Sequence, residues 1–192
     1  ASKFVNDLLR LMVSRNGSDL FLTAAFPPAI KVDGKITKVS PQPLTGQHTM
    51  ALARSVMNDK QAAEFEKTKE CNFAISPTGI GRFRCNAFIQ QGNVGLVMRT
   101  IPGTIPSIDS LGLPQVLKDV AMTKRGLVIF VGATGSGKST SLAGMVDYRN
   151  ENSFGHIITI EDPVEFVHPH KNCIVTQREV GIDTEDWFSA LK

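Results

Sequence analysis

Residues 132–139 read Gly-Ala-Thr-Gly-Ser-Gly-Lys-Ser and fit the pattern G-x-x-x-x-G-K-[ST] in full. Glycines let a backbone approach a phosphate closely, and successive N–H groups can then surround its oxygens. In this pattern, the lysine (Lys138) meets the β- and γ-phosphates and the hydroxyl of Ser139 binds Mg²⁺. The predicted cofactors are therefore ATP or ADP with Mg²⁺, and the predicted nucleotide-binding residues are Gly132, Ala133, Thr134, Gly135, Ser136, Gly137, Lys138, Ser139 and Thr140.

The flanking residues predict the elements that position this loop. Gly126–Val131 is an apolar run rich in β-branched residues, typical of a buried strand, and residues 138–148 are typical of a helix. A strand, a glycine-rich turn and a helix in this order aim the positive end of the helix dipole at the phosphate. The flanks favour a phosphate-binding loop over the alternative of a plain glycine-rich turn.

Three carboxylates follow the next predicted strand, residues 156–160. Glu161, Asp162 and Glu165 come at and beyond its carboxyl end, where ligands bind in open α/β sheets. Acids there can hold Mg²⁺ through water or orient an attacking water. The apolar strand and the acids at its end could be interpreted as a Walker B element. This strand is, however, the first after the loop's helix, whereas the Walker B strand of RecA-like ATPases comes later in the chain. A charged loop facing solvent is the alternative.

Residues 1–100 predict a small α+β domain with a strong hairpin signal at Asp33-Gly34. Residues 101–112, with prolines at 102 and 106, are the predicted linker, and residues 113–192 the α/β domain with a parallel sheet. The expected helices are 3–13 with Ser2 as a cap, 46–57 with Thr45 as a cap, 59–67, 114–123 and one that begins near Asp183. The expected strands of the first domain are 19–23, 29–32, 35–39, 71–76, 82–90 and 94–100.

In the predicted strand 82–90, apolar and polar residues alternate. Phe83, Cys85, Ala87 and Ile89 would face a core, and the polar face would carry Arg82, Arg84 and Asn86. On spacing alone, this polar face is interpreted as a solvated side of an antiparallel sheet.

Composition is that of a globular protein, with 42% hydrophobic and 20% charged residues and a net charge of +3. The charge is divided, because residues 1–100 carry 13 Lys and Arg against 7 Asp and Glu, and residues 101–192 carry 8 against 11. The opposite signs suggest two domains, or subunits that meet head to tail. No dense basic run argues for nucleic acid, and no apolar run is long enough to span a bilayer.

The cysteines and histidines carry less information about function. Cys71, Cys85 and Cys173 are odd in number and widely spaced, so we interpret them as free thiols in a reducing cytosol and as small buried hydrophobes. The pair His168 and His170 could bind a metal, but the intervening proline and the lack of a third ligand nearby favour a surface loop.

Taken together, the chain resembles the secretion-ATPase superfamily, and within it the pilus-retraction ATPases of the PilT/PilU family, with a closer likeness to the PilU branch. The strings Ile-Glu-Asp-Pro-Val-Glu-Phe and Gln-Arg-Glu-Val, in this order after the phosphate loop, are the most specific. The matching segments are 17–20 with 27–28, 32–34, 81–84 with 86–88, 99–102, 132–139, 160–166 and 177–180.

The resemblance implies a PAS-like N-terminal domain followed by a RecA-like phosphate-loop domain. It implies cytoplasmic, homo-hexameric rings at the inner face of the inner membrane. These hydrolyse ATP to retract type IV pili for twitching motility, with a partner retraction ATPase and the membrane's pilus platform protein. Residues 161–165 correspond to the family's Asp box. By the same resemblance, the candidate arginine fingers are Arg82, Arg84 and Arg99. The other candidate catalytic residues are Lys138, Glu161, Asp162 and Glu165.

Family members continue well beyond the point where this sequence stops, at Lys192, so we expect a fragment with an incomplete RecA-like domain. We expect the 192 residues alone to bind nucleotide weakly and to turn it over slowly. Two other functions stay open within the family: a pilus-extension or type II secretion ATPase, and a non-hydrolysing accessory subunit that docks on a partner motor. A nucleic-acid translocase is disfavoured by the absence of a basic groove signature.

Overall fold

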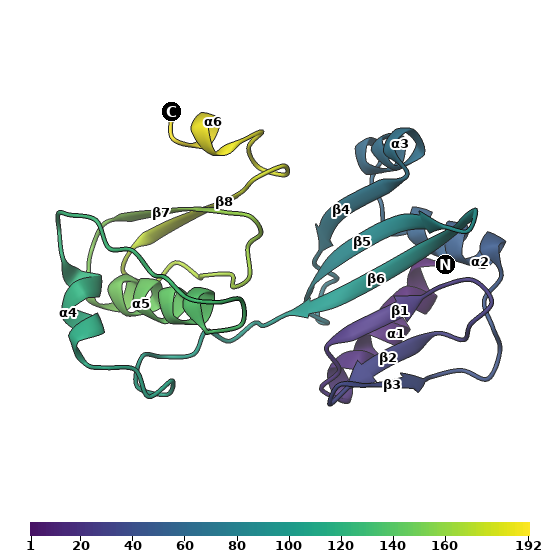
Figure 1. Ribbon diagram of the computed structural model, residues 1–192, viewed down its shortest axis with the longest axis horizontal. Coiled ribbons are helices and arrows are strands. Elements are labelled where there is room, and N and C mark those ends of the chain that lie inside the picture. The colour runs from purple at the N-terminus through teal and green to yellow at the C-terminus, as the bar shows by residue number, and fades with distance from the viewer. The chain divides into compact units, whose positions relative to one another are not determined.

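The computed structural model describes residues 1–192, which divide into two compact units, Ala1–Ile101 and Pro102–Lys192 (Figure 1). The N-terminal unit is built on one antiparallel sheet with the strand order β3-β2-β1-β6-β5-β4. Its strands are β1 (Asp19–Leu22), β2 (Ala29–Val32), β3 (Lys35–Lys38), β4 (Glu70–Ile75), β5 (Arg82–Gln90) and β6 (Asn93–Ile101), and its helices are α1 (Ser2–Ser14), α2 (Gly46–Arg54) and α3 (Asp59–Thr68).

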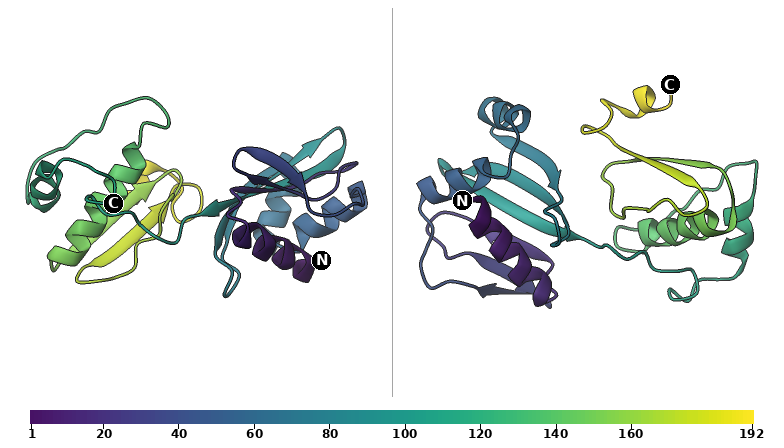
Figure 2. Two further views of the ribbon diagram at one scale, coloured as in Figure 1. Left: turned by 90° about the horizontal axis from the view of Figure 1, so that it is seen from below. Right: turned by 180° about the vertical axis from the view of Figure 1, so that it is seen from behind.

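The core of this unit lies between the sheet and its helices, and Figure 2 shows α1 lying across one face of the sheet. Helix α1 buries four residues at helical spacing, Val5, Leu8, Leu9 and Met12. Helices α2 and α3 begin with capping boxes. The side chain of Thr45 accepts from the His48 N–H, and that of Asn58 accepts from the Gln61 N–H.

Most elements predicted for residues 1–100 are confirmed, including the two-residue hairpin turn at Asp33-Gly34. Both turn residues have positive φ, 49° and 77°, as a tight hairpin requires. Phe83, Cys85 and Ala87 are buried, as the alternation on β5 predicts. The predicted Ser2 cap is wrong, because α1 already includes Ser2 and its cap position, Ala1, has no side chain that could accept a hydrogen bond.

The C-terminal unit pairs two strands in parallel, β7 (His156–Glu161) and β8 (Ile174–Glu179). Figure 1 shows helix α5 (Lys138–Asn152) alongside them. Two shorter helices, α4 (Val116–Met122) and α6 (Trp187–Ala190), complete the unit. Strand β8 was not predicted, although its first three residues, Ile, Val and Thr, are β-branched. In the segment 101–112, Ile108 is buried and the carbonyl of Pro106 lies against Gly144 of α5.

Two predictions in this unit are wrong. Residues 126–131 form no strand, and Leu127 and Val131 are 84% and 86% exposed. A buried parallel strand needs a hydrogen-bonded neighbour and covered faces, whereas β7 and β8 pair only with each other. The last helix begins at Trp187 rather than near Asp183, because the Asp183 carboxylate accepts from the Glu179 N–H in a turn and Asp186 is the helix cap.

Cys71, Cys85 and Cys173 are all buried free thiols, in agreement with the sequence. Burial raises the pKa of the Cys85 thiol to about 12, so it stays protonated and packs as a hydrophobic residue. None of the helices in the structure is both long and apolar enough to cross a membrane.

Candidate nucleotide-binding site

The phosphate-loop sequence forms a turn that depends on its glycines. Gly135 and Gly137 have φ of 79° and 89°, a region that residues with a Cβ rarely adopt. The Ser136 N–H donates to the carbonyl of Ala133 at 3.2 Å, which tightens the turn. The glycines of the phosphate-loop pattern are thus also the residues that the backbone conformation of the turn requires.

Lys138 is folded back over this turn. Its Nζ donates to the carbonyl oxygens of Gly132 and Ala133, both at 2.8 Å. The ammonium group is therefore held against the loop's own backbone.

Helix α5 starts directly after the turn and has no side-chain cap, because its cap position is Gly137. The first N–H groups of any helix lack acceptors within the helix and carry the positive end of its dipole. In α2 and α3, a side chain serves some of these donors. In α5, they remain available to an anion, which is how helix N-termini bind phosphate.

Ser139 shares a cavity of about 390 Å³ with the acidic segment. The serine comes from the first turn of α5, and Glu161, Asp162 and Glu165 come from the end of β7 and the loop beyond it. The predicted Mg²⁺ ligand and the three predicted carboxylates thus line one cavity, but the carboxylates do not form a cluster of three that could by itself hold a metal ion. Hydroxyl and carboxylate oxygens are the donors that Mg²⁺ prefers, so this set fits the cation.

The Glu161 carboxylate is held on one side by neutral donors. Its Oε2 accepts from Thr159 Oγ1 at 2.7 Å and from Gln177 Nε2 at 2.9 Å. The Gln177 amide also donates to the Phe166 carbonyl at 2.8 Å and accepts from the His168 N–H at 2.7 Å. In the sequence, Gln177 stands out only as part of the string Gln-Arg-Glu-Val. Its position beside Thr159 in the parallel ladder is what places it at the site.

His168 lines the same cavity and is buried, which corrects the prediction of a surface loop at this residue. Burial lowers the pKa of the imidazole, and the carboxylates of Asp147 and Glu161 act in the opposite direction. The segment that follows is tied to the end of α5. The buried Asn150 side chain donates to the Pro169 carbonyl at 2.7 Å and accepts from the Lys171 N–H at 3.1 Å.

The three predicted arginines belong to the N-terminal unit. Arg84 and Arg99 are cross-strand partners on β5 and β6, and Arg82 comes two residues before Arg84 on the same face. Arg99 Nε donates to the Asp19 carboxylate at 2.9 Å, and Asp19 itself is buried. One of the three is therefore already paired within its own sheet.

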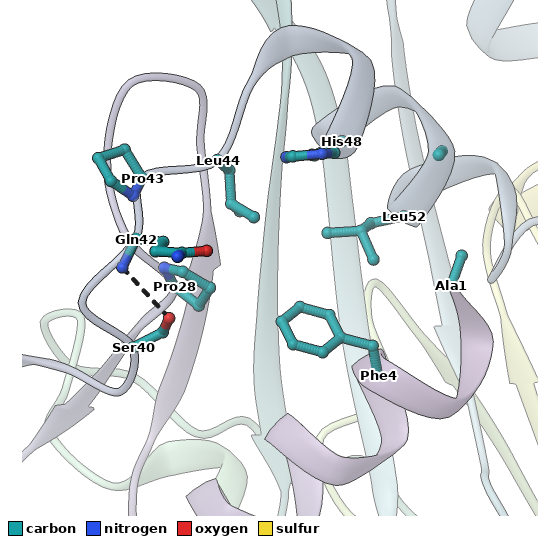
Figure 3. A pocket seen from close by; sticks show the side chains of 10 residues that line it. Ala1, Phe4, Pro28, Ser40, Gln42, Pro43, Leu44, His48 and Leu52 are labelled. Atoms are coloured by element: carbon teal, nitrogen blue, oxygen red, sulfur yellow. Dashed lines mark hydrogen bonds between the residues drawn. The ribbon is translucent and has the colours of Figure 1, made fainter.

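The N-terminal unit also has an apolar groove between α1, α2 and the loop before α2 (Figure 3). Phe4 and Leu52 point into it, and its remaining lining includes Pro28, Leu44 and His48. No Lys, Arg, Asp or Glu side chain lines the groove.

Comparison with known proteins gives a consistent result. The family model described as "Type II/IV secretion system protein" matches residues 2–191. The type IV pilus ATPase PilU of Pseudomonas aeruginosa is 58% identical over 185 residues, which are 96% of this chain and 48% of that protein. The type IV pilus retraction ATPase PilT of the same organism is 45% identical over 188 residues, which are 98% and 55% of the two chains.

Among solved structures, the crystal structure of the pilus retraction motor PilT with bound ADP superposes with a TM-score of 0.93 and 42% identity. The match covers 97% of this chain and 55% of that one. The chain thus spans about half the length of the relatives it matches.

Proposed function

The chain belongs to the family of type II/IV secretion system proteins, and from this premise we propose that it is the nucleotide-binding part of a PilU-like motor that powers type IV pilus retraction by ATP hydrolysis. The observation that carries the proposal is the cavity that Ser139, the last residue of the phosphate-loop pattern, shares with Glu161, Asp162 and Glu165. The 58% identity with PilU and the 45% identity with PilT support a retraction motor.

In this proposal, residues 132–140 bind the phosphates of ATP or ADP through backbone N–H groups and Lys138. Ser139 holds Mg²⁺, and the carboxylates of Glu161, Asp162 and Glu165 bind it through water or orient the attacking water. Mg²⁺ supplies neutralisation of the charge that develops on the phosphates. Catalysis of this kind depends on positioning and electrostatics more than on covalent chemistry.

Arg82, Arg84 and Arg99 are proposed to complete the site as arginine fingers within a homo-hexameric ring. Guanidinium groups suit this role because they bind phosphate oxygens in a bidentate manner. In addition, the N-terminal unit is proposed to be PAS-like, the C-terminal unit to be part of a RecA-like domain, and residues 101–112 to link them. The ring would work in the cytoplasm at the inner membrane, with a partner retraction ATPase and the pilus platform protein.

The test compares Lys138→Ala with Lys124→Ala in the full-length protein. Lys124 is an exposed lysine outside the loop and serves as the matched control. Loss of Lys138 is expected to weaken ATP binding at least about tenfold and to lower kcat about 100-fold or more, since a charge-assisted contact to phosphate is lost. A Lys138→Ala protein with wild-type ATPase activity would refute the proposed site.

Two alternatives are separated by measuring pilus retraction in cells that carry Lys138→Ala, with and without the partner motor. An engine loses its own contribution when Lys138 is replaced. An accessory subunit supports retraction equally well with or without Lys138, provided that the partner motor is present. A pilus-extension motor would instead show its defect in the number of assembled pili.

A further inference from the structure

The loop from Asp162 to His168 has no regular secondary structure, yet it carries two of the candidate carboxylates. Its conformation depends on side chains from β8. Glu179, which is buried, accepts from the Val164 N–H at 3.0 Å. Gln177, two residues earlier on the same face of β8, contacts the loop at both Phe166 and His168.

The Gln177 amide therefore connects three groups at once. It donates to the Phe166 carbonyl and to the Glu161 carboxylate, and it accepts from the His168 N–H. Only a primary amide can donate twice and accept in this way. Glutamate could accept but would repel Glu161, and methionine could make none of these bonds despite a similar volume.

These bonds bear on where Glu161 points. Both of its donors, Thr159 Oγ1 and Gln177 Nε2, are on the single oxygen Oε2. The protein thus holds the carboxylate by Oε2 and leaves Oε1 without a hydrogen bond, in a residue that lines the cavity shared with Ser139. A carboxylate held in this way is oriented before any ligand binds, which is the arrangement that favours catalysis.

We propose that Gln177 is the positioning residue that orients Glu161 towards the cavity shared with Ser139 and thereby sets the rate of nucleotide hydrolysis. The inference rests on the proposed function, since it concerns the same site. It adds a residue that does not line the cavity and acts through a carboxylate.

The experiment compares Gln177→Met and Gln177→Glu with Thr176→Val in the full-length protein. Thr176 lies next to Gln177 on β8, and its hydroxyl contacts His156, away from the acidic loop. We expect Gln177→Met to lower kcat about 10- to 100-fold while the KM for ATP stays within about twofold, because misplacing a catalytic group affects the chemical step. Gln177→Glu should be at least as slow, and Thr176→Val should match the wild type.

Thr159→Val provides a second route, because it removes the other donor to Glu161 Oε2 without touching the loop. We expect kcat to fall about 3- to 10-fold with an unchanged KM. If Gln177→Met does not fold, as judged by circular dichroism, Gln177→Glu decides the matter. Wild-type turnover in a folded Gln177→Met or Gln177→Glu would overturn the inference.

A rise in KM parallel to the fall in kcat would also overturn it, because the defect would then lie in binding. Failure of the proposed function looks different. In that case, the wild-type protein itself would show no ATP hydrolysis that depends on Lys138, and the Gln177 variants would not be needed to reach that conclusion.

Discussion

The two units of this chain are stabilised in different ways. In the N-terminal unit, large side chains such as Phe73, Phe83 and Leu20 are at most 2% exposed, between a complete antiparallel sheet and its helices. In the C-terminal unit, apolar side chains that could belong to a core lie on the surface, with Leu127 and Ile174 84% and 62% exposed. The first unit is held by packing, and the second has a smaller core and one helix beside two strands.

The candidate site nevertheless lies in the less packed unit. Its geometry depends on local bonds: glycine conformations in the phosphate loop, the lysine bonds to nearby carbonyls, and the amide of Gln177. This contrast indicates that the shape of a phosphate loop is encoded over a few residues. The shape of a sheet is not, because it requires neighbours from distant parts of the chain.

The largest effect that would test this contrast is a pair of matched truncations in the 192-residue chain. Phe83→Ala should reduce the free energy of unfolding of the N-terminal unit by about 3–5 kcal/mol, since it empties a packed position. Leu127→Ala should change that of the C-terminal unit by less than about 0.5 kcal/mol, since the side chain is exposed. Urea titrations followed by circular dichroism measure both.

Equal losses in the two variants would show that Leu127 is buried in solution, and the contrast between the units would then be wrong. Leu22→Ala, at another fully buried position of the same core, serves as a second large truncation that should behave like Phe83→Ala.

A smaller effect concerns the arginines on the outer face of the N-terminal sheet. Arg99→Ala should cost about 1–2 kcal/mol of stability, because it leaves the buried Asp19 carboxylate with only Ser18 Oγ as a side-chain donor. Arg84→Ala, which breaks no such pair, should cost less than about 0.5 kcal/mol. Thermal unfolding of both variants gives the comparison. If the two losses were alike, the Asp19 pair would not contribute to stability, and activity lost in Arg99→Ala could be assigned to its proposed role as an arginine finger.

The smallest effect concerns His168 in the C-terminal unit. Its pKa is lowered in the folded state by burial, so below the ordinary histidine value of about 6.5 the unfolded chain binds the proton more readily. The contribution of the neutral, buried His168 to the free energy of unfolding is therefore fully present above about pH 6.5, and it decreases as the pH falls towards the folded pKa. Nearby carboxylates oppose the shift and keep the effect small.

Melting temperatures of the wild type and His168→Gln between about pH 7.5 and about pH 5.5 measure this difference. The wild type should lose more stability on acidification than His168→Gln does. Identical pH profiles for the wild type and His168→Gln would show that burial of the imidazole has no energetic consequence.

The features of the fold that are most predictable from the sequence are those encoded locally. The Asp33-Gly34 hairpin, the Thr45 cap and the alternation on β5 each depend on a few neighbouring residues, and the structure contains all three. The strand predicted at 126–131 failed, because an apolar run becomes a strand only where another strand pairs with it.

The site was predictable in part for the same reason. The loop at 132–139 has a spacing that can be recognised without any tertiary contact. The pairing of Arg99 with Asp19 joins residues 80 positions apart, and the contact of Gln177 with Glu161 joins residues 16 positions apart across two strands. Polar residues of this kind leave no periodic signal, so only the folded chain shows which of them meet.

Strand β6 runs to Ile101, the last residue of the N-terminal unit, and is held on both sides to its end. Ile101 pairs with Arg82 of β5, while the Thr100 N–H donates to the Ser18 carbonyl at 3.0 Å and its hydroxyl to that of Gly17 at 3.2 Å. A mechanical load applied to the chain beyond this point, in the direction of β6, would be shared by two ladders of hydrogen bonds loaded in shear. Such a load would have to break bonds of both ladders together before β6 could leave the sheet.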